Sequence, residues 1–310
     1  MAFYSPDRAM AQVLENLVRA LEQEDRPGLA DQLSITWVRF SHSQLDRGAQ
    51  LDPKAYWALP CTGAGWHGDV QRYPASVVKL IYLVAAESWL QQDRLLDDPE
   101  LRRALAAMVQ HSSNNATEHV LDRLSGTTGG PALEPTAMAT WMAQRQLVNR
   151  WLQALNWPEL NGSNACQKTW DDGPYGREHV FYGADNANRN RLSSDGVARM
   201  LLGVMAGVLV SPPACGRMRQ LLSRSLDSAE RAADPDNQVD GFLGEGLPVG
   251  TRLWSKAGWM SRARHDAAYI EHDELPPSLL VVFSEGKTCA TDAALLPEIA
   301  RHLIHARLDG

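Results

Sequence analysis

The pattern of apolar and polar positions along the chain predicts strands near both ends and helices between them. The first residues carry apolar side chains at the 3.6-residue period of an amphipathic helix, with Ser5 as its cap and Pro6 in its first turn. Residues 33–40, LSITWVRF, are rich in β-branched and aromatic side chains and are predicted as a strand. Strand character returns only near the C-terminus, before a last helix at residues 292–307. The strand segments there are residues 251–258, 267–272 and 278–285.

The middle of the chain is predicted to be helical. Residues 161–190 interrupt the helical period with a polar, Gly- and Asn-rich stretch, which is typical of a long surface loop with a functional purpose. This order predicts an α+β fold in which the N- and C-terminal strands form one antiparallel sheet flanked by helices, with an all-α domain inserted. We expect residues 1–75 and 212–310 to form the α/β part. Residues 76–211 form the helical part, with a loop at about 157–192. The predicted helices cover residues 76–89, 99–111, 115–124, 136–155 and 194–209.

Composition and charge narrow the classes of function. The chain has 310 residues, of which 44% are hydrophobic and 22% charged, enough to bury a substantial core. A net charge of -7 without a cluster of Lys and Arg argues against binding to nucleic acid or to an anionic membrane. The N-terminal segment shows no secretory apolar region, so we expect a cytoplasmic protein. The four cysteines and nine histidines show no metal-type spacing, so we expect neither a metal nor another cofactor.

One lysine stands inside a segment that is apolar almost all the way round, YPASVVKLIYLV at residues 73–84. Ser76 falls in the first turn of the predicted helix, and Lys79 lies one turn later on the same face, within reach of the serine hydroxyl. Burial lowers the pKa of a lysine, and a neutral lysine can act as the general base for a serine nucleophile. The alternative is that Ser76 only caps the helix and Lys79 reaches the surface. A second S-x-x-K, from Ser284 to Lys287, follows a predicted strand and has no such setting.

A second segment carries a family resemblance. Residues 112–124, SSNNATEHVLDRL, resemble the S-D-N-x-A-T-N-x-L-L-D-R-L segment of class A β-lactamases and the penicillin-recognising serine hydrolases. Without gaps, Ser112 and Asn114 fall on the serine and asparagine of the family's S-x-N motif. Ser113 and Asn115 also satisfy S-x-N but lose the rest of the match, so we prefer the first pair. The alternative is a Ser- and Asn-rich cap before a helix.

A third segment, LWSKAGWMSRARHDAAYI at residues 253–270, resembles the family's K-T-G strand and the turn after it. Lys256 and Gly258 take the first and last places of K-T-G, and Arg264 precedes the next strand. The glycine lets a substrate approach the strand, and the ammonium attracts a carboxylate. Three motifs in the family's order indicate a member of this family, and its β-lactamase/transpeptidase-like fold agrees with the predicted sheet.

The resemblance implies a role for each motif residue. Ser76 would be the acylated nucleophile and Lys79 its general base. Ser112 would relay a proton to the leaving group, and Asn114 would bind the acyl amide of the substrate.

The residues of the K-T-G strand have implied roles as well. Lys256 would hold the Ser112 hydroxyl and the carboxylate of the substrate, with Arg264 as a second anchor. The backbone N–H groups of Ser76 and Trp259 would form the oxyanion hole, and Gly258 would let the substrate approach.

The chain departs from the family in three places, one of which is Glu118, where the family usually has an asparagine that braces the loop. Efficient class A β-lactamases carry a deacylating glutamate in an E-x-x-L-N pattern, but WPELN at residues 157–161 puts Trp157 at that place. A second register reaches Glu178 without the L-N, and we expect both Glu159 and Glu178 to be solvated loop carboxylates. Ala257 replaces the threonine of K-T-G. The acylation machinery is therefore complete, while fast hydrolysis of β-lactams is not expected.

The sequence thus predicts a serine hydrolase that forms an acyl-enzyme on Ser76. Its substrate would be an amide or ester of small-molecule or peptide type, such as a β-lactam or a D-amino-acid peptide. Two alternatives stay open, namely a glutaminase or esterase on the same fold and a catalytically silent relative that binds a ligand or peptide.

Overall fold

A single seven-stranded sheet forms the centre of the computed structural model, which describes residues 3–24 and 26–308. The strand order is β1-β3-β2-β7-β6-β5-β4, and all neighbours are antiparallel except the parallel pair β1 and β3. N-terminal and C-terminal strands therefore share one sheet, and the predicted α+β fold is confirmed. The strands are β1 (Ser5–Pro6), β2 (Leu33–Arg39), β3 (Thr62–Trp66), β4 (Ser223–Arg224), β5 (Arg252–Met260), β6 (Ala263–His272) and β7 (Leu275–Glu285).

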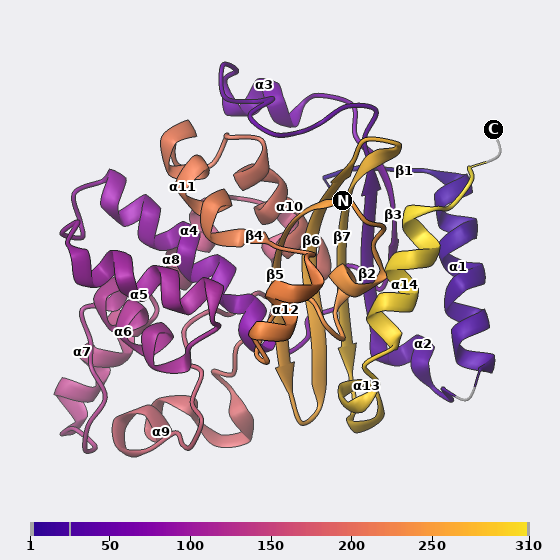
Figure 1. Cartoon of the computed structure of the whole chain (residues 1–310). Coiled ribbons are helices and arrows are strands. Elements are labelled where there is room, and N and C mark those ends of the chain that lie inside the picture. The colour runs from indigo at the N-terminus through magenta and orange to yellow at the C-terminus, as the bar shows by residue number, and fades with distance from the viewer. Residues whose placement is uncertain (1–2, 25, 309–310) are drawn as a thin grey trace.

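Two long helices, α1 and α14, cover one face of the sheet and pack against each other (Figure 1). The amphipathic face of α1 forms one apolar cluster with α14 and the strands, which stabilises this layer. Smaller helices lie at the ends of this layer. The helices here are α1 (Arg8–Gln23), α2 (Leu29–Gln32), α13 (Lys287–Thr291) and α14 (Leu295–Ile304), with the 3₁₀ turn η4 (Leu243–Gly246) against α14.

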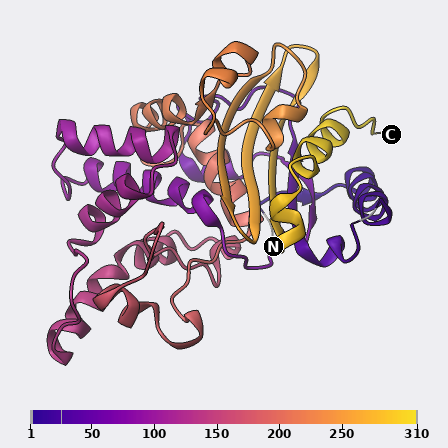
Figure 2. The same ribbon diagram turned by 60° about the horizontal axis from the view of Figure 1, so that its bottom comes forward.

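The helices from α4 to α11 lie on the opposite side of the sheet, as both ribbon views show (Figures 1 and 2). Helix α10 packs directly against β2, β6 and β7. The predicted division into residues 76–211 and the rest stays a prediction, because α10 falls in the helical part and yet covers the sheet. The helices of this layer are α4 (Val78–Gln91), α5 (Pro99–Gln110), α6 (Asn114–Ser125), α7 (Pro135–Arg145), α8 (Leu147–Ala154), α9 (Gly176–Tyr182), α10 (Ser194–Met205) and α11 (Pro212–Leu222), and two short helices, α3 (Pro53–Trp57) and α12 (Ser228–Ala233), lie outside it.

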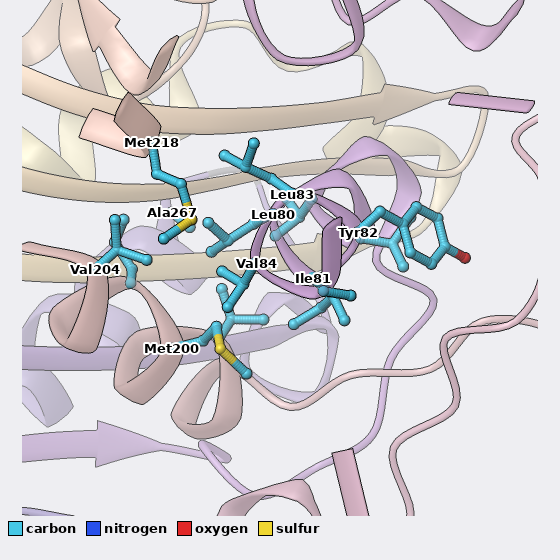
Figure 3. Close-up of a cluster of buried hydrophobic side chains, with 14 of the residues drawn as sticks. Leu80, Ile81, Tyr82, Leu83, Val84, Met200, Val204, Met218 and Ala267 are labelled. Carbon is cyan, nitrogen blue, oxygen red and sulfur yellow. The ribbon is translucent and has the colours of Figure 1, made fainter. Parts of the chain in front are cut away.

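Helix α4 lies at the centre of this helical layer and is buried on every side from Val78 to Trp89. Figure 3 shows its aliphatic side chains packed against α10, α11 and Ala267 of β6. A helix that is apolar all round is held by neighbours on all faces, so its first turn has a fixed position relative to the sheet. The residues labelled from these elements are Leu80, Ile81, Tyr82, Leu83, Val84, Met200, Val204, Met218 and Ala267.

Several predicted elements differ in detail. Asp7 and not Ser5 caps α1, because its carboxylate accepts from the backbone N–H of Met10, and Ser5 and Pro6 pair with β3 instead. Strand β3 was not predicted, since TGAGW has few β-branched residues. The helix expected at residues 136–155 is interrupted between α7 and α8, the one expected at 292–307 is the shorter α14, and the loop contains the short helix α9.

Candidate active site

A cavity of about 520 Å3 lies where the start of α4, the start of α6 and strand β5 meet. It gathers residues that are far apart in the sequence. Two further predicted residues, Lys79 and Lys256, are fully buried beneath it and hydrogen-bond to the Ser112 hydroxyl. The predicted site residues that line the cavity are Ser76, Ser112, Asn114, Gly258, Trp259 and Arg264.

Ser76 lies on the 3₁₀ turn η1 (Ala75–Val77) directly before α4. Ala75 has a φ of 45°, in the left-handed region that residues other than glycine rarely adopt. Such a conformation persists only where the surroundings hold the backbone. Strand β5 does so here, because a β-carbon at Gly258 would lie only 2.9 Å from the backbone nitrogen of Ser76. Glycine is therefore required where β5 meets this turn.

A neutral histidine fixes the backbone just before the turn. His265 of β6 is completely buried, and burial lowers its pKa to about 4. Its Nδ1 accepts from the backbone N–H of Ser284 at 2.9 Å, so Nε2 carries the proton and donates to the carbonyl of Tyr73 at 2.8 Å. His265 thus positions the segment that leads into Ser76.

Lys79 is fully buried one turn into the helix. Burial lowers its pKa to about 7, partly opposed by the nearby carboxylate of Asp171. Its Nζ donates to the Ser112 carbonyl, to the Ser112 hydroxyl at 3.2 Å and to Asn114 Oδ1 at 2.9 Å. Among the described residues it makes no hydrogen bond to Ser76, so the expected direct Ser76–Lys79 contact is not formed. The lysine instead anchors the loop that carries Ser112.

The Ser112 hydroxyl lies between two lysines, because Lys256 Nζ also donates to it at 3.1 Å. Burial lowers the pKa of Lys256 well below its usual value, and the charges of Lys79 and Arg224 lower it further. Two buried lysines this close favour at least one neutral amine. A hydroxyl that accepts from both can direct its own proton into the cavity.

The structure also separates the two possible S-x-N registers. Ser113 caps α6 by accepting from the backbone N–H of Ala116 at 3.2 Å, and the Asn115 side chain is exposed. Ser112 and Asn114 are the pair in contact with Lys79. Ser113 is therefore the residue that caps the helix, and the preferred pair, Ser112 and Asn114, is the one that reaches the site.

Sequence reasoning missed Gln238, which lies in an irregular segment between α12 and η4. Its Oε1 accepts from Lys256 Nζ and from the backbone N–H of Ala257 at 3.3 Å, and its Nε2 donates to the carbonyls of Val109 and Gln110, both at 2.9 Å. Gln238 therefore joins β5 to the end of α5, just before Ser112. No local pattern in the sequence signals this role.

Arg264 and Trp259 form one wall of the cavity. The Arg264 guanidinium lies 5.2 Å from the ring centre of Phe242 and 5.6 Å from that of Trp259. Both Arg264 Nε and Trp259 Nε1 donate to the carbonyl of Ala290, at 3.2 and 2.8 Å. Trp259 remains 60% exposed, so this wall offers an aromatic surface and a cation to a bound molecule.

The two candidate loop glutamates are buried and do not line the cavity, so the prediction that they are solvated was wrong. Glu159 pairs with Arg199 at 2.7 Å. Glu178 pairs with Arg145 at 2.5 Å, and burial raises its pKa. Each carboxylate is paired through one oxygen with the guanidinium of a helix residue, which ties the 157–192 loop to that helix and gives both glutamates a structural role.

The loop carboxylate that does reach the cavity is Asp171, which was not predicted. Asn114 Nδ2 donates to Asp171 Oδ1 at 2.6 Å, while Asn114 Oδ1 accepts from Lys79. The Asn114 amide thus links the buried lysine to a carboxylate of the loop. The only sequence signal was the polar character of the loop, which names no single residue.

Within residues 3–24 and 26–308, no group of three or more His, Cys, Asp and Glu side chains is placed to hold a metal ion. No helix in the same residues combines the length and the apolar character needed to cross a bilayer.

Comparison with known proteins supports the family resemblance and the fold. The family model described as the β-lactamase enzyme family matches residues 90–306, a segment that begins after Ser76 and Lys79 and includes Ser112 and Lys256. No curated protein sequence matches the chain.

Solved structures show the same fold at low sequence identity. PBP-A aligns with a TM-score of 0.60 and 16% identity over 97% of this chain and 96% of its own. A PBP-A mutant solved as an acyl-enzyme complex with penicillin G has a TM-score of 0.61 and 17% identity over the same shares. A β-lactamase from Sphaerobacter thermophilus has a TM-score of 0.60 and 15% identity over 93% and 95% of the two chains. The predicted β-lactamase/transpeptidase-like fold is therefore confirmed.

Proposed function

The chain belongs to the β-lactamase enzyme family, and we propose that it is a serine hydrolase that forms an acyl-enzyme on Ser76. The observation that carries this proposal is the Ser112 hydroxyl held between buried Lys79 and Lys256 in the cavity that Ser76 lines. A buried lysine with a pKa of about 7 is neutral often enough at neutral pH to accept the proton of a serine.

The chemistry follows from these positions. The Ser76 Oγ bonds to the carbonyl carbon of an amide or ester, and its proton passes to neutral Lys79. The resulting oxyanion accepts from the backbone N–H groups of Ser76 and Trp259. When the bond to the leaving nitrogen or oxygen breaks, that atom takes the Ser112 proton, which protonated Lys79 replaces.

Substrate binding uses the remaining residues. Gly258 lets the acyl group lie against β5, and Asn114 meets the acyl amide. Arg264 and Lys256 attract a carboxylate on the leaving side. A β-lactam or a peptide ending in a D-amino acid has this arrangement of amide and carboxylate, so we propose a small molecule or peptide of this kind as substrate.

We propose that deacylation is slow. Glu159 and Glu178 do not line the cavity and are paired with arginines. Asp171 lines it but holds Asn114 through one oxygen. No loop glutamate is thus available to activate a water, so the acyl-enzyme should accumulate.

The test is the intact mass of the protein after incubation with benzylpenicillin or with an activated ester such as p-nitrophenyl acetate. We expect a covalent adduct on the wild type and none on Ser76→Ala. Ser112→Ala should slow acylation strongly, whereas Ser113→Ala, which removes only the cap of α6, should not. An adduct on Ser76→Ala, or neither adduct nor turnover with the wild type, would contradict the proposal.

A further inference from the structure

Asp171 brings a negative charge to the part of the cavity that Asn114 lines. The residue lies in the 157–192 loop ahead of α9, and its side chain is exposed to solvent. One oxygen, Oδ1, accepts from Asn114 Nδ2 at 2.6 Å. The other, Oδ2, has no hydrogen-bond partner in the part of the chain that the structure describes, and it is therefore available to a ligand.

The charges around the cavity favour a cation on this side. Its lining includes the carboxylates of Asp171, Asp236 and Asp240 and one guanidinium, that of Arg264. Asp240 is paired with Arg231 at 2.7 Å. Arg264 donates to the carbonyls of Ala290 and Gly241 and belongs to the β6 wall, and it forms no ion pair with Asp171 within the described residues.

Neither lysine pairs directly with Asp171 among the described residues. Lys79 and Lys256 are fully buried, and their amino groups donate to Ser112, Asn114, Ala257 and Gln238. A substrate that reaches Asn114 therefore meets a carboxylate with one unused oxygen. An uncharged or anionic acyl group would have to desolvate this oxygen without replacing its hydrogen bonds.

We propose that Asp171 binds an ammonium group on the acyl half of the substrate, so that this enzyme prefers amides or esters of an acyl group with a free amine. The inference rests on the proposed function, because the acyl side of the site is defined by Ser76 and Asn114. An ammonium and a carboxylate form a charge-assisted hydrogen bond, which also selects against a negatively charged acyl group.

Three penicillins test this directly, because they share one phenyl-bearing acyl chain and differ only in the group on its α-carbon. Ampicillin carries an ammonium there, benzylpenicillin a hydrogen and carbenicillin a carboxylate. The second-order rate constant for acylation, followed by intact mass at a pH where the amine is protonated, should fall in that order. We expect ampicillin to react about tenfold faster than benzylpenicillin, the scale of one charge-assisted hydrogen bond in a partly desolvated site.

The matched variants are Asp171→Asn and Asp172→Asn. Asn at position 171 keeps an acceptor for Asn114 but removes the charge, so the advantage of ampicillin should disappear. Asp172 is the exposed neighbour and does not line the cavity, so its variant should keep the wild-type order.

Three other results of the penicillin experiment would contradict the proposed role of Asp171. Equal acylation rates for ampicillin and benzylpenicillin on the wild type would overturn this inference and leave the acyl-enzyme standing. An Asp171→Asn variant that keeps the preference but releases the acyl group more slowly would show that Asp171 serves hydrolysis and not recognition. No acylation by any of the three penicillins would overturn the inference, and if p-nitrophenyl acetate also gave neither adduct nor turnover, the proposed function would be refuted with it.

Discussion

Replacing Gly258 by alanine should disable the oxyanion hole while leaving the fold in place. The new β-carbon would lie 2.9 Å from the carbonyl oxygen of Pro74, 2.9 Å from the nitrogen of Ser76 and 3.0 Å from that of Val77. All three are backbone atoms, and the distances are roughly half an ångström or more below the optimum for a van der Waals contact. The strand and the turn must therefore separate. Because Trp259 follows Gly258, its N–H moves away from the Ser76 N–H.

The expected size of the effect follows from the loss of one donor. Removing a single oxyanion-hole donor slows the reaction by about 10²–10³, or about 3–4 kcal/mol of transition-state stabilisation. The assay is the rate of acylation of Gly258→Ala by an activated ester, with circular dichroism and thermal unfolding to check the fold.

A second glycine provides the matched control. At Gly216 in α11 a β-carbon would meet only the end of the Arg219 side chain at 3.9 Å, so Gly216→Ala should acylate at the wild-type rate. If folded Gly258→Ala acylates within about threefold of the wild type, the oxyanion hole does not lie between Ser76 and Trp259.

Three further predictions follow from the site and its surroundings. The acylation rate, measured as a pH–rate profile, should fall as the pH drops below about 7, because burial gives Lys79 a pKa of about 7 and only the neutral amine accepts a proton. In the same measurement Asp171→Asn should move the midpoint to lower pH, because it removes a negative charge that favours the ammonium form of Lys79. Glu159→Gln and Glu178→Gln should leave the lifetime of the acyl-enzyme unchanged, because neither side chain lines the cavity, as the decay of the adduct mass will show. Arg145→Ala should lower the free energy of unfolding by about 3–5 kcal/mol in urea denaturation, because Arg145 is fully buried and its loss leaves the buried Glu178 with only the more distant Lys168, at 3.5 Å.

Each of these three predictions can be contradicted by a specific result. A rate that stays flat through neutral pH would remove Lys79 as the base. A much longer adduct lifetime in either glutamate variant would give that glutamate a part in deacylation. An unchanged urea midpoint for Arg145→Ala would mean that the pair is not buried in solution.

The sequence predicts residues well where chemistry and local structure coincide. Lys79 could be recognised because an ammonium inside an apolar helix has a large desolvation cost, and such a cost indicates use. Gly258 was predicted because a glycine lets a substrate approach the strand, and the structure adds that a β-carbon there would also clash with the backbone of Ser76. The two halves of the sheet followed from strand patterns at both ends of the chain.

Residues whose role depends on tertiary contacts were not predicted. Gln238 and Asp171 reach the site from irregular segments, and nothing in their neighbouring residues indicates where their side chains point. Glu159 and Glu178 were expected in solvent because carboxylates usually are, but arginines from other helices pair with them in the interior. The partners of Lys79 were also misjudged, because the loop before α6 folds over it and takes its hydrogen bonds.

The most direct test of the central claim is to locate the adduct by peptide mapping after acylation with benzylpenicillin. Trypsin should release residues 73–79, YPASVVK, in which Ser76 is the only serine. We predict that the penicilloyl mass lies on this peptide and disappears in Ser76→Ala. An adduct on the peptide that contains Ser112, or on any other, would contradict Ser76 as the nucleophile.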